Sequence, residues 1–262
     1  RRLKHEEETA VTRYSRVIVC SEDERAFWAS GDRGRVWVVP NGVSEALFRH
    51  HERQEAQDRL VFVGTLEYRP NEDAVMWFCS EVLPRVAREV PTVSFFVVGR
   101  NPSRRLKELH DGRRVNIVGR VPDVTPYVRE AALSVVPLRA GGGTRLKILE
   151  SLALGTPVVS TSVGFEGLAL ESGRDLLVAD DPEAFASAVV RSLRNRDIRR
   201  CLADAGRERV RAAYGWHGIQ DNLVALVREW AEERGLEIAN RETSEGAVLL
   251  EDAPRGACGA NV

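Results

Sequence analysis

Short apolar runs, each ended by a glycine, alternate with segments of helix length in the central part of the chain. Three such runs, with the glycines that follow them, are residues 60–63 before Gly64, residues 93–98 before Gly99 and residues 115–118 before Gly119. Continuous apolar runs are typical of strands covered on both faces, and alternating strands and helices form right-handed βαβ units. The sequence therefore predicts an α/β fold, a Rossmann-like parallel sheet flanked by helices. In such sheets ligands bind beyond the carboxyl ends of the strands, so the three glycines and the loop at residues 141–143 are expected to converge on one edge.

Further apolar runs and helical patterns on both sides of this region predict the domain organisation. Strands are expected at residues 16–20, 36–39, 133–136, 157–160 and 176–179, and helices at residues 71–89, 102–110, 123–132, 182–194, 196–213 and 216–234. Pro84 is expected to kink the first of these helices. We expect a main domain at residues 60–234, after a lead-in of residues 1–48 and a polar linker at residues 49–59. Residues 235–262 are interpreted as a disordered tail.

A glycine-rich stretch at residues 141–143 directly precedes a predicted helix. Thr144 is predicted to cap this helix, which places Arg145 and Lys147 in the first turn, where the helix dipole disfavours each cation by about 0.3–1 kcal/mol. A bound phosphate would offset that cost, because N–H groups at a helix N-terminus attract anions and glycines allow close approach. Glu150 lies on the same face as Lys147 and can accept hydrogen bonds from sugar hydroxyls. The alternative is a solvated charged face without a ligand.

Charge and residue content argue against several classes of protein. The formal net charge of −1 gives no electrostatic basis for nucleic-acid binding. No stretch approaches the ~18 apolar residues of a transmembrane helix, and residues 1–8 lack the apolar core of a signal peptide. The four cysteines form no CxxC pair and the five histidines lack metal-ligand spacing, so neither disulfides nor a metal site is expected. The G-x-G-x-x-G fingerprint of nicotinamide dehydrogenases is absent.

Six stretches of the chain form an ordered set of motifs. They are Val17-Ile-Val-Cys-Ser21-Glu, Val38-Val-Pro-Asn-Gly-Val43, Phe62-Val-Gly64, Val97-Val-Gly-Arg100, Val118-Gly-Arg-Val-Pro-Asp123 and Gly141-Gly-Gly-Thr-Arg-Leu-Lys-Ile-Leu-Glu150 with its continuation to Thr161. In this order and spacing they resemble glycosyltransferase family 4, the retaining GT-B enzymes of the glycosyl transferases group 1. The resemblance covers about residues 10–232.

The resemblance implies the C-terminal, donor-binding half of a GT-B fold. The implied reaction moves a sugar, of hexosyltransferase type, from a nucleotide-diphosphate sugar to an acceptor with retention of configuration. Residues 1–48 resemble the end of the acceptor domain, and the helix at residues 216–234 resembles the element that packs back on it. Most of the acceptor half is missing, so the acceptor (a glycan, a lipid or a small molecule) would bind a separate N-terminal domain. The alternative is a catalytically incomplete module that binds a nucleotide sugar but needs that domain for turnover.

The resemblance also implies roles for individual residues. Arg145 and Lys147 would act as the catalytic pair, holding the diphosphate and stabilising charge on the leaving nucleotide. Glu150 would hold the ribose hydroxyls, and backbone groups of Arg120 and Val121 would meet the base. The full set of expected donor-binding residues is Gly64, Thr65, Arg69, Gly99, Arg100, Arg120, Val121, Gly141, Gly142, Gly143, Thr144, Leu146 and Glu150.

The sequence departs from the family pattern at two places. Gly142 stands where the family has the first glutamate of its Glu-x7-Glu pair, so the usual carboxylate partner of the donor sugar is absent and the sugar stays open. The loop from Gly64 to Asn71 lacks the family's two cations, one of which Arg69 is expected to replace. No cofactor and no metal are expected in the donor half. A cytoplasmic location is expected, with peripheral association at the inner face of the membrane as an alternative.

Overall fold

The computed structural model describes residues 13–28, 33–49 and 55–235. The chain forms two compact units, residues 1–223 and 224–262, and the main sheet lies in the first. Helix α11 (Trp216–Glu232) spans the boundary between them. The tail expected at residues 235–262 lies outside the described residues apart from Gly235. None of the helices in the described part is long and apolar enough to cross a lipid bilayer.

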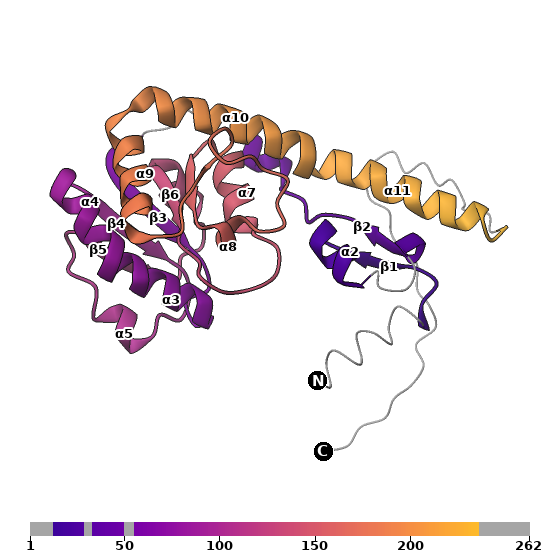
Figure 1. The fold of residues 1–262 in the computed structure, drawn as a ribbon, viewed down its shortest axis with the longest axis horizontal. Coiled ribbons are helices and arrows are strands. Elements are labelled where there is room, and N and C mark those ends of the chain that lie inside the picture. Colours follow the sequence, from indigo (N-terminus) through magenta and orange to yellow (C-terminus); the bar gives the residue numbers. More distant parts are fainter. Residues whose placement is uncertain (1–12, 29–32, 50–54, 236–262) are drawn as a thin grey trace, which may run out of the picture. The chain divides into compact units, whose positions relative to one another are not determined.

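The main sheet contains six parallel strands in the order β5-β4-β3-β6-β7-β8 (Figure 1). The strands are β3 (Ala56–Val63), β4 (Ser94–Val98), β5 (Val115–Gly119), β6 (Ala131–Val136), β7 (Val158–Ser160) and β8 (Leu177–Val178). Strand β3 pairs with both β4 and β6, so the chain order reverses there. Open α/β sheets bind ligands at such a switch point, beyond the carboxyl ends of the strands. The predicted parallel α/β fold is confirmed.

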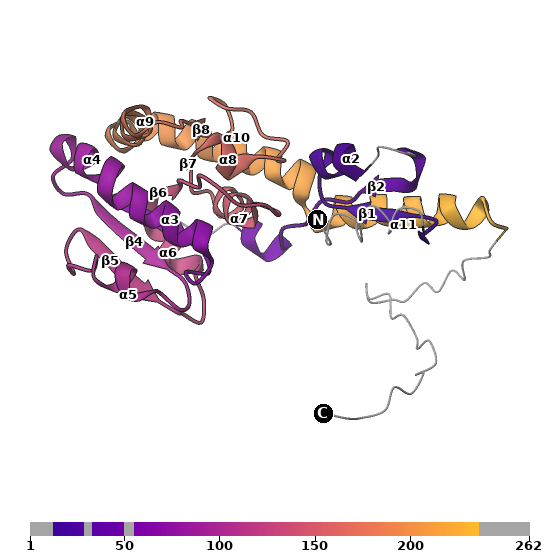
Figure 2. The same ribbon diagram turned by 60° about the horizontal axis from the view of Figure 1, so that its bottom comes forward.

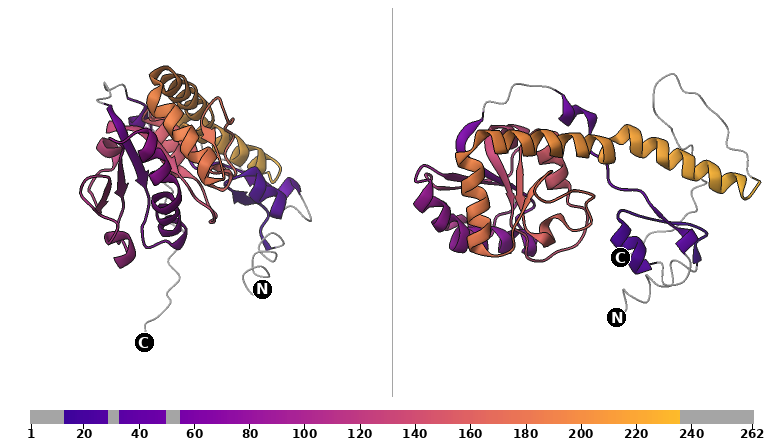
Figure 3. Two further views of the ribbon diagram at one scale, coloured as in Figure 1. Left: turned by 60° about the vertical axis from the view of Figure 1, so that its left-hand side comes forward. Right: turned by 45° about the horizontal axis from the view of Figure 1, so that its top comes forward.

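Helices lie on both faces of this sheet, as Figure 2 and Figure 3 show. They are α3 (Arg69–Trp77), α4 (Leu83–Glu89), α5 (Arg104–Lys107), α6 (Thr125–Glu130), α7 (Leu146–Ala153), α8 (Ser162–Phe165), α9 (Pro182–Arg194) and α10 (Arg196–Tyr214). Phe62 of β3 belongs to the larger core, where the rings of Phe78 and Phe95 lie 4.6 Å apart. Val61, on the opposite face of the strand, packs with Val128 of α6. Both faces of β3 are therefore buried, as its continuous apolar run predicts.

The helix expected at residues 71–89 is divided into three parts. A π-helical segment, η3 (Phe78–Val82), separates α3 from α4, and the N–H of Leu83 donates to the carbonyl of Phe78, five residues earlier. Pro84 has no N–H to donate, and its ring would clash with the carbonyl four residues before it. The regular helix is thus interrupted by a π-helical segment just before the proline, and the expected kink itself stays a prediction.

Several element boundaries differ from those that the sequence predicts, among them the start of β3 and the length of α5. Strand β3 begins at Ala56 instead of Leu60, so the end of the expected linker at residues 49–59 belongs to the sheet. Helix α5 (Arg104–Lys107) covers only part of the helix expected at residues 102–110. Its N-cap is Ser103, whose Oγ accepts a hydrogen bond from the Leu106 N–H at 3.3 Å.

The lead-in contains a second, two-stranded parallel sheet of β1 (Val17–Val19) and β2 (Val36–Val38). Helix α2 (Glu22–Trp28) connects them, followed by the short helices η1 (Arg33–Arg35) and η2 (Glu45–Phe48) on either side of β2. Two side-chain contacts stabilise the start of α2. Ser21 Oγ accepts from the Glu24 N–H at 3.2 Å, and the Glu24 carboxylate reaches back to the Cys20 N–H at 2.8 Å.

Candidate functional site

The glycines that follow β3 and β4 and the glycine that ends β5 meet at the carboxyl edge of the sheet. The Gly64 N–H donates to Val98 O at 3.0 Å, and the Gly99 N–H donates to Gly119 O at 2.9 Å. A Cβ atom on Gly99 would lie only 1.7 Å from the Gly64 carbonyl oxygen, so no larger residue fits. A Cβ atom on Gly141, after β6, would lie 3.3 Å from Pro70 Cβ at the start of α3. The predicted convergence of these glycines is confirmed.

The predicted cap of α7 is wrong. The helix begins at Leu146, and Arg145, not Thr144, occupies the cap position, without a side-chain capping bond. The Thr144 hydroxyl instead accepts a hydrogen bond from Asn41 Nδ2, a residue of the lead-in. Arg145 therefore precedes the first turn, and only Lys147 lies within it. We call residues 141–145 the glycine loop; Gly141 and Gly143 have φ of +121° and +87°, which favour glycine.

The side chain of Lys147, in the first turn of α7, extends to the end of β3. Its Nζ donates to Asn71 Oδ1 at 2.6 Å and lies 4.6 Å from the centroid of the Phe62 ring, a cation–π contact. Burial, with a smaller contribution from the positive charge of Arg145, lowers the pKa of Lys147 to about 8. None of the described carboxylates pairs with this ammonium, so its charge is not neutralised within that part of the chain.

Glu150 shares a cavity of about 120 Å³ with Lys147, which we call the lysine cavity. It is lined by Leu47, Val63, Val124, Thr125, Val128, Lys147, Glu150, Ser151 and Leu154. Burial raises the pKa of the Glu150 carboxyl. Among the described residues the Glu150 side chain has no hydrogen-bond or ion-pair partner. A cation and an unpartnered carboxylate thus line one small, mostly apolar cavity.

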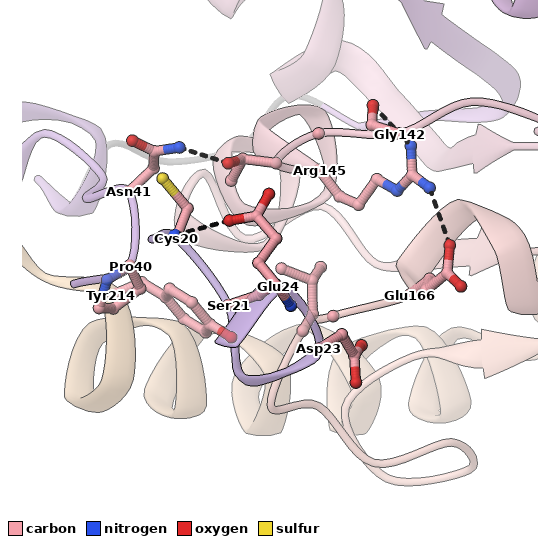
Figure 4. A pocket seen from close by; sticks show the side chains of 14 residues that line it. Cys20, Ser21, Asp23, Glu24, Pro40, Asn41, Gly142, Arg145, Glu166 and Tyr214 are labelled. Carbon is pink, nitrogen blue, oxygen red and sulfur yellow. Dashed lines mark hydrogen bonds and ion pairs between the residues drawn. The ribbon is translucent and has the colours of Figure 1, made fainter. Parts of the chain in front are cut away.

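Arg145 is only 6% exposed, and its guanidinium is engaged by the chain itself (Figure 4). Its Nη2 donates to Gly141 O at 2.8 Å and lies 3.4 Å from Glu166 Oε2, and its Nη1 lies 3.4 Å from Gly142 O. Its Nε is buried without a partner in the structure. Arg145 therefore holds the two loop carbonyls in addition to any ligand it contacts.

Arg145 and Glu166 line a second cavity of about 280 Å³, which we call the arginine pocket (Figure 4). It is lined by Cys20, Ser21, Asp23, Glu24, Pro40, Asn41, Gly142, Gly143, Thr144, Arg145, Glu166, Gly167, Leu168 and Tyr214. The first six of these come from the lead-in, so the lead-in completes the wall of a pocket at the glycine loop. The acidic side chains and the loop N–H groups suit a ligand rich in hydroxyl groups.

The remaining predicted site residues lie near this edge but do not line either cavity. Arg69 and Arg120 are exposed, and Arg100 forms an exposed ion pair with Glu67 at 3.5 Å. Val121 is partly buried against the smaller core. Two others are Thr65, whose carbonyl accepts a hydrogen bond from Asn71, and Leu146, whose side chain is partly exposed.

Sequence reasoning missed three residues of the two cavities and their surroundings. Asn71 binds Lys147, Asn41 binds Thr144, and Glu166 pairs with Arg145. Each contact joins segments far apart in the chain, so no spacing rule reveals it. Glu166 carries the clearest signal, because it lies in the segment that follows the strand predicted at residues 157–160, at the edge of the parallel sheet where ligands bind.

The described residues contain no group of three or more His, Cys, Asp or Glu side chains that could hold a metal ion. Two histidines have structural contacts: His110 Nδ1 accepts from the Ile117 N–H at 3.2 Å, and His217 lies 3.4 Å from Glu45. His50 and His51 lie outside the described residues. Trp216 packs on Gly42, where a Cβ atom would lie 2.6 Å from the indole ring.

Comparison with known proteins gives a family match and several relatives. The sequence model of the family described as Glycosyl transferases group 1 matches residues 57–195. The D-inositol 3-phosphate glycosyltransferase of Geodermatophilus obscurus is 28% identical to this chain, over 93% of this chain and 58% of that protein. The chain spans about half the length of the curated relatives it matches.

Solved structures show the same fold. Sucrose-phosphate synthase from Thermosynechococcus elongatus matches with a TM-score of 0.66 and 26% identity, over 83% of this chain and 58% of that chain. The Anabaena protein HepE, solved in complex with UDP and glucose, matches with a TM-score of 0.70 and 15% identity, over 84% of this chain and 65% of that chain. The α/β architecture with its parallel sheet is therefore that of solved glycosyltransferase structures.

Proposed function

The chain belongs to the glycosyl transferases group 1 family, and from that premise we propose that it provides the donor site for transfer of a sugar from a nucleotide-diphosphate sugar to an acceptor. The observation that carries the proposal is the lysine cavity. It is lined by an unneutralised ammonium, Lys147, and a carboxylate without a described partner, Glu150, both from α7. A nucleoside diphosphate offers the two complementary groups, phosphate oxygens for Lys147 and ribose hydroxyls for Glu150.

The chemistry required of this site is stabilisation of a leaving group. When the bond between the sugar C1 and the phosphate oxygen breaks, its electron pair stays on the diphosphate. The acceptor oxygen bonds to C1, and its proton passes to the leaving diphosphate. Lys147 and the positive end of the α7 dipole stabilise the charge that develops on the diphosphate. Arg145 contributes more weakly, because Gly141 and Gly142 already occupy part of its guanidinium. We propose retention of configuration at C1.

Uridine diphosphate is the first ligand to test, because the HepE structure contains UDP and glucose. Calorimetric titration with UDP, GDP, uridine and pyrophosphate separates the contributions of base, ribose and phosphates. We expect UDP or GDP to bind at least about tenfold more tightly than the nucleoside alone, since the charged phosphate contacts are lost in the nucleoside. The cations of the site belong to the protein, so we expect the same affinity in EDTA. Nucleoside binding as strong as diphosphate binding would refute the site.

The second candidate is a binding module that turns nothing over by itself. Its support is the length of the chain, which spans about half of its curated relatives. In that case the acceptor, a glycan, a lipid or a small molecule, binds a separate N-terminal domain. An assay that follows UDP release from UDP-glucose with and without candidate acceptors separates the two candidates. Acceptor-dependent release supports the enzyme, and the anomeric configuration of the product, read by NMR, tests retention; tight binding without release supports the module.

A further inference from the structure

The Lys147 ammonium is held by one neutral side chain. Asn71 Oδ1, from α3, accepts from Lys147 Nζ at 2.6 Å, and among the described residues no other hydrogen-bond acceptor contacts this nitrogen. The ring of Phe62 also contacts the ammonium, with its centroid 4.6 Å away. The position of the ammonium beside the lysine cavity thus depends on Asn71.

Asn71 is itself fixed in place and in orientation. It is 5% exposed, and its Nδ2 donates to the Thr65 carbonyl at 2.9 Å. A Cβ atom on Gly64 would lie 2.9 Å from the same Nδ2, so only glycine leaves room for the amide. The two contacts determine which end of the amide is oxygen, because an ammonium can only donate and a carbonyl can only accept. Asn71 thereby links the loop after β3 to the first turn of α7.

We propose that Asn71 is a positioning residue for Lys147, which it orients beside Glu150 in the lysine cavity for contact with the diphosphate of the nucleotide. The part of the inference that concerns the diphosphate rests on the proposed function. A neutral amide suits this role because it aligns the ammonium without cancelling its charge, whereas a carboxylate would neutralise the charge that attracts phosphate.

Among the described residues, the hydrogen bond to Asn71 and the cation–π contact with Phe62 favour the ammonium form of Lys147. Arg145, on the same segment, and burial both oppose it, which is why the pKa lies at about 8. Glu150 lines the same cavity but makes no ion pair with Lys147. The acidic neighbours of Asn71 on α3 are engaged elsewhere: Glu72 accepts from Ser103 Oγ at 2.6 Å, and Asp73 pairs with Arg139 at 2.5 Å.

The composition of the chain allows a direct test without any ligand. It contains three lysines, Lys4, Lys107 and Lys147, so NMR of lysine labelled with ¹³C and ¹⁵N follows each titration separately. In Asn71→Leu we expect the Lys147 midpoint to fall by about one pH unit, because the ammonium loses its acceptor. In Asn71→Asp, which keeps the size of the side chain, we expect it to rise by about one pH unit, because a carboxylate favours the ammonium. Lys107, exposed on α5, is the internal control and should not move.

A second arm measures UDP affinity from about pH 7 to about pH 10, where the terminal phosphate stays ionised. For the native chain we expect affinity to fall as pH rises through about 8, as Lys147 loses its proton. At about pH 8, Asn71→Leu should bind UDP about fivefold more weakly, since a pKa one unit lower leaves about a fifth as much of the charged form. Asn71→Asp should bind UDP more weakly at every pH, because its carboxylate opposes the diphosphate.

The NMR titration and the UDP titration test different parts of the inference, so each can contradict its own part. A purely structural role for Asn71 lowers the melting temperature of both variants without moving the Lys147 midpoint in opposite directions, and that result overturns the inference. If the midpoints move as expected but Lys147→Ala leaves UDP affinity unchanged, the link between Asn71 and Lys147 stands and the proposed nucleotide site does not. If Asn71→Leu does not fold, the isosteric Asn71→Asp decides the question alone. A rise of the Lys147 midpoint supports the inference, and an unchanged midpoint overturns it.

Discussion

The lysine cavity and the arginine pocket are each lined by one cation, yet the chain holds the two cations differently. Lys147 donates to a single neutral amide, at 2.6 Å, and meets no described carboxylate. Arg145 donates to the carbonyls of Gly141 and Gly142 and lies 3.4 Å from Glu166. Contacts within the fold therefore already use much of the Arg145 guanidinium, whereas the charge of Lys147 is available to an anionic ligand. We therefore expect Arg145 to contribute mainly to the structure of the glycine loop and Lys147 mainly to ligand binding.

The carboxylates differ in the same way. Glu150 is partly buried, has no described partner, and has a pKa that burial raises. The Glu166 side chain is 63% exposed and forms an ion pair with Arg145. An unpartnered carboxylate in an apolar cavity costs stability that a ligand hydroxyl can restore, while an exposed one stays solvated. The comparison predicts a graded set of effects on UDP affinity.

The largest effect is expected from Lys147→Ala. Loss of a charged hydrogen bond to phosphate costs about 1.5–3 kcal/mol, so UDP affinity should fall about 10- to 150-fold in calorimetry at about pH 7. Lys107→Ala, which removes an exposed lysine from α5, is the matched control and should bind UDP like the native chain. Equal UDP affinities for the native chain and Lys147→Ala would show that Lys147 does not bind the nucleotide, and the contrast drawn here between Lys147 and Arg145 would be wrong.

A smaller loss is expected from Glu150→Gln, which keeps an acceptor but removes its charge. Hydrogen bonds to charged groups exceed neutral ones by about 1 kcal/mol, so UDP affinity should fall about fivefold, with pyrophosphate affinity unchanged. Glu208→Gln, an exposed glutamate of α10, is the control.

The same variant tests the sign of the burial effect on stability. Because the folded pKa of Glu150 is raised, the group favours the fold below its unfolded pKa and loses that contribution as pH rises through the folded pKa. At about pH 7 Glu150→Gln should therefore melt at the same or a higher temperature than the native chain. Weaker binding together with a clearly lower melting temperature would mean that Glu150 supports the fold instead of the ligand.

Arg145→Met is expected to change stability more than affinity. The variant removes the hydrogen bonds to the two loop carbonyls, which should cost about 1–3 kcal/mol of unfolding free energy in urea titration. UDP affinity should fall only about threefold, less than for Lys147→Ala, because part of the guanidinium already serves the loop. The opposite ranking, with Arg145→Met weakening UDP more than Lys147→Ala, would make Arg145 the main phosphate ligand.

Local patterns in the sequence were sufficient to predict the sheet and the edge where these cavities lie. The apolar run at residues 60–63 and its terminal glycine predict a buried strand and a close approach at Gly64, because strand periodicity and glycine sterics act over a few residues. The convergence of Gly64 and Gly99 follows from parallel topology alone, and the structure confirms it. The ligand-binding edge therefore follows from the order of the strands and the glycines that end them.

The contacts that distinguish the two cavities could not be predicted in the same way. Thr144 has the chemistry of a helix cap, but Asn41, 103 residues earlier in the chain, takes its hydroxyl. Asn71 and Lys147 are 76 residues apart, and their pairing depends on how α3 and α7 pack at the switch point. Propensity describes what a side chain can do, and tertiary packing decides which partner it meets.

The smallest effect is expected from Glu166→Gln, and it should concern only the sugar. Gly142 offers no side chain to a ligand. In the arginine pocket, the Glu166 carboxylate forms an ion pair with Arg145, and we expect it to contact the sugar instead. We expect UDP affinity to stay unchanged and the ratio of UDP-glucose to UDP affinity to fall about two- to fivefold, the worth of a solvent-exposed hydrogen bond. Competition titrations of both ligands on one preparation measure this ratio, with Glu171→Gln, another exposed glutamate of the same loop region, as the control. If Glu166→Gln weakens the binding of UDP itself, the arginine pocket holds the nucleotide, and the assignment of the nucleotide to the lysine cavity is wrong.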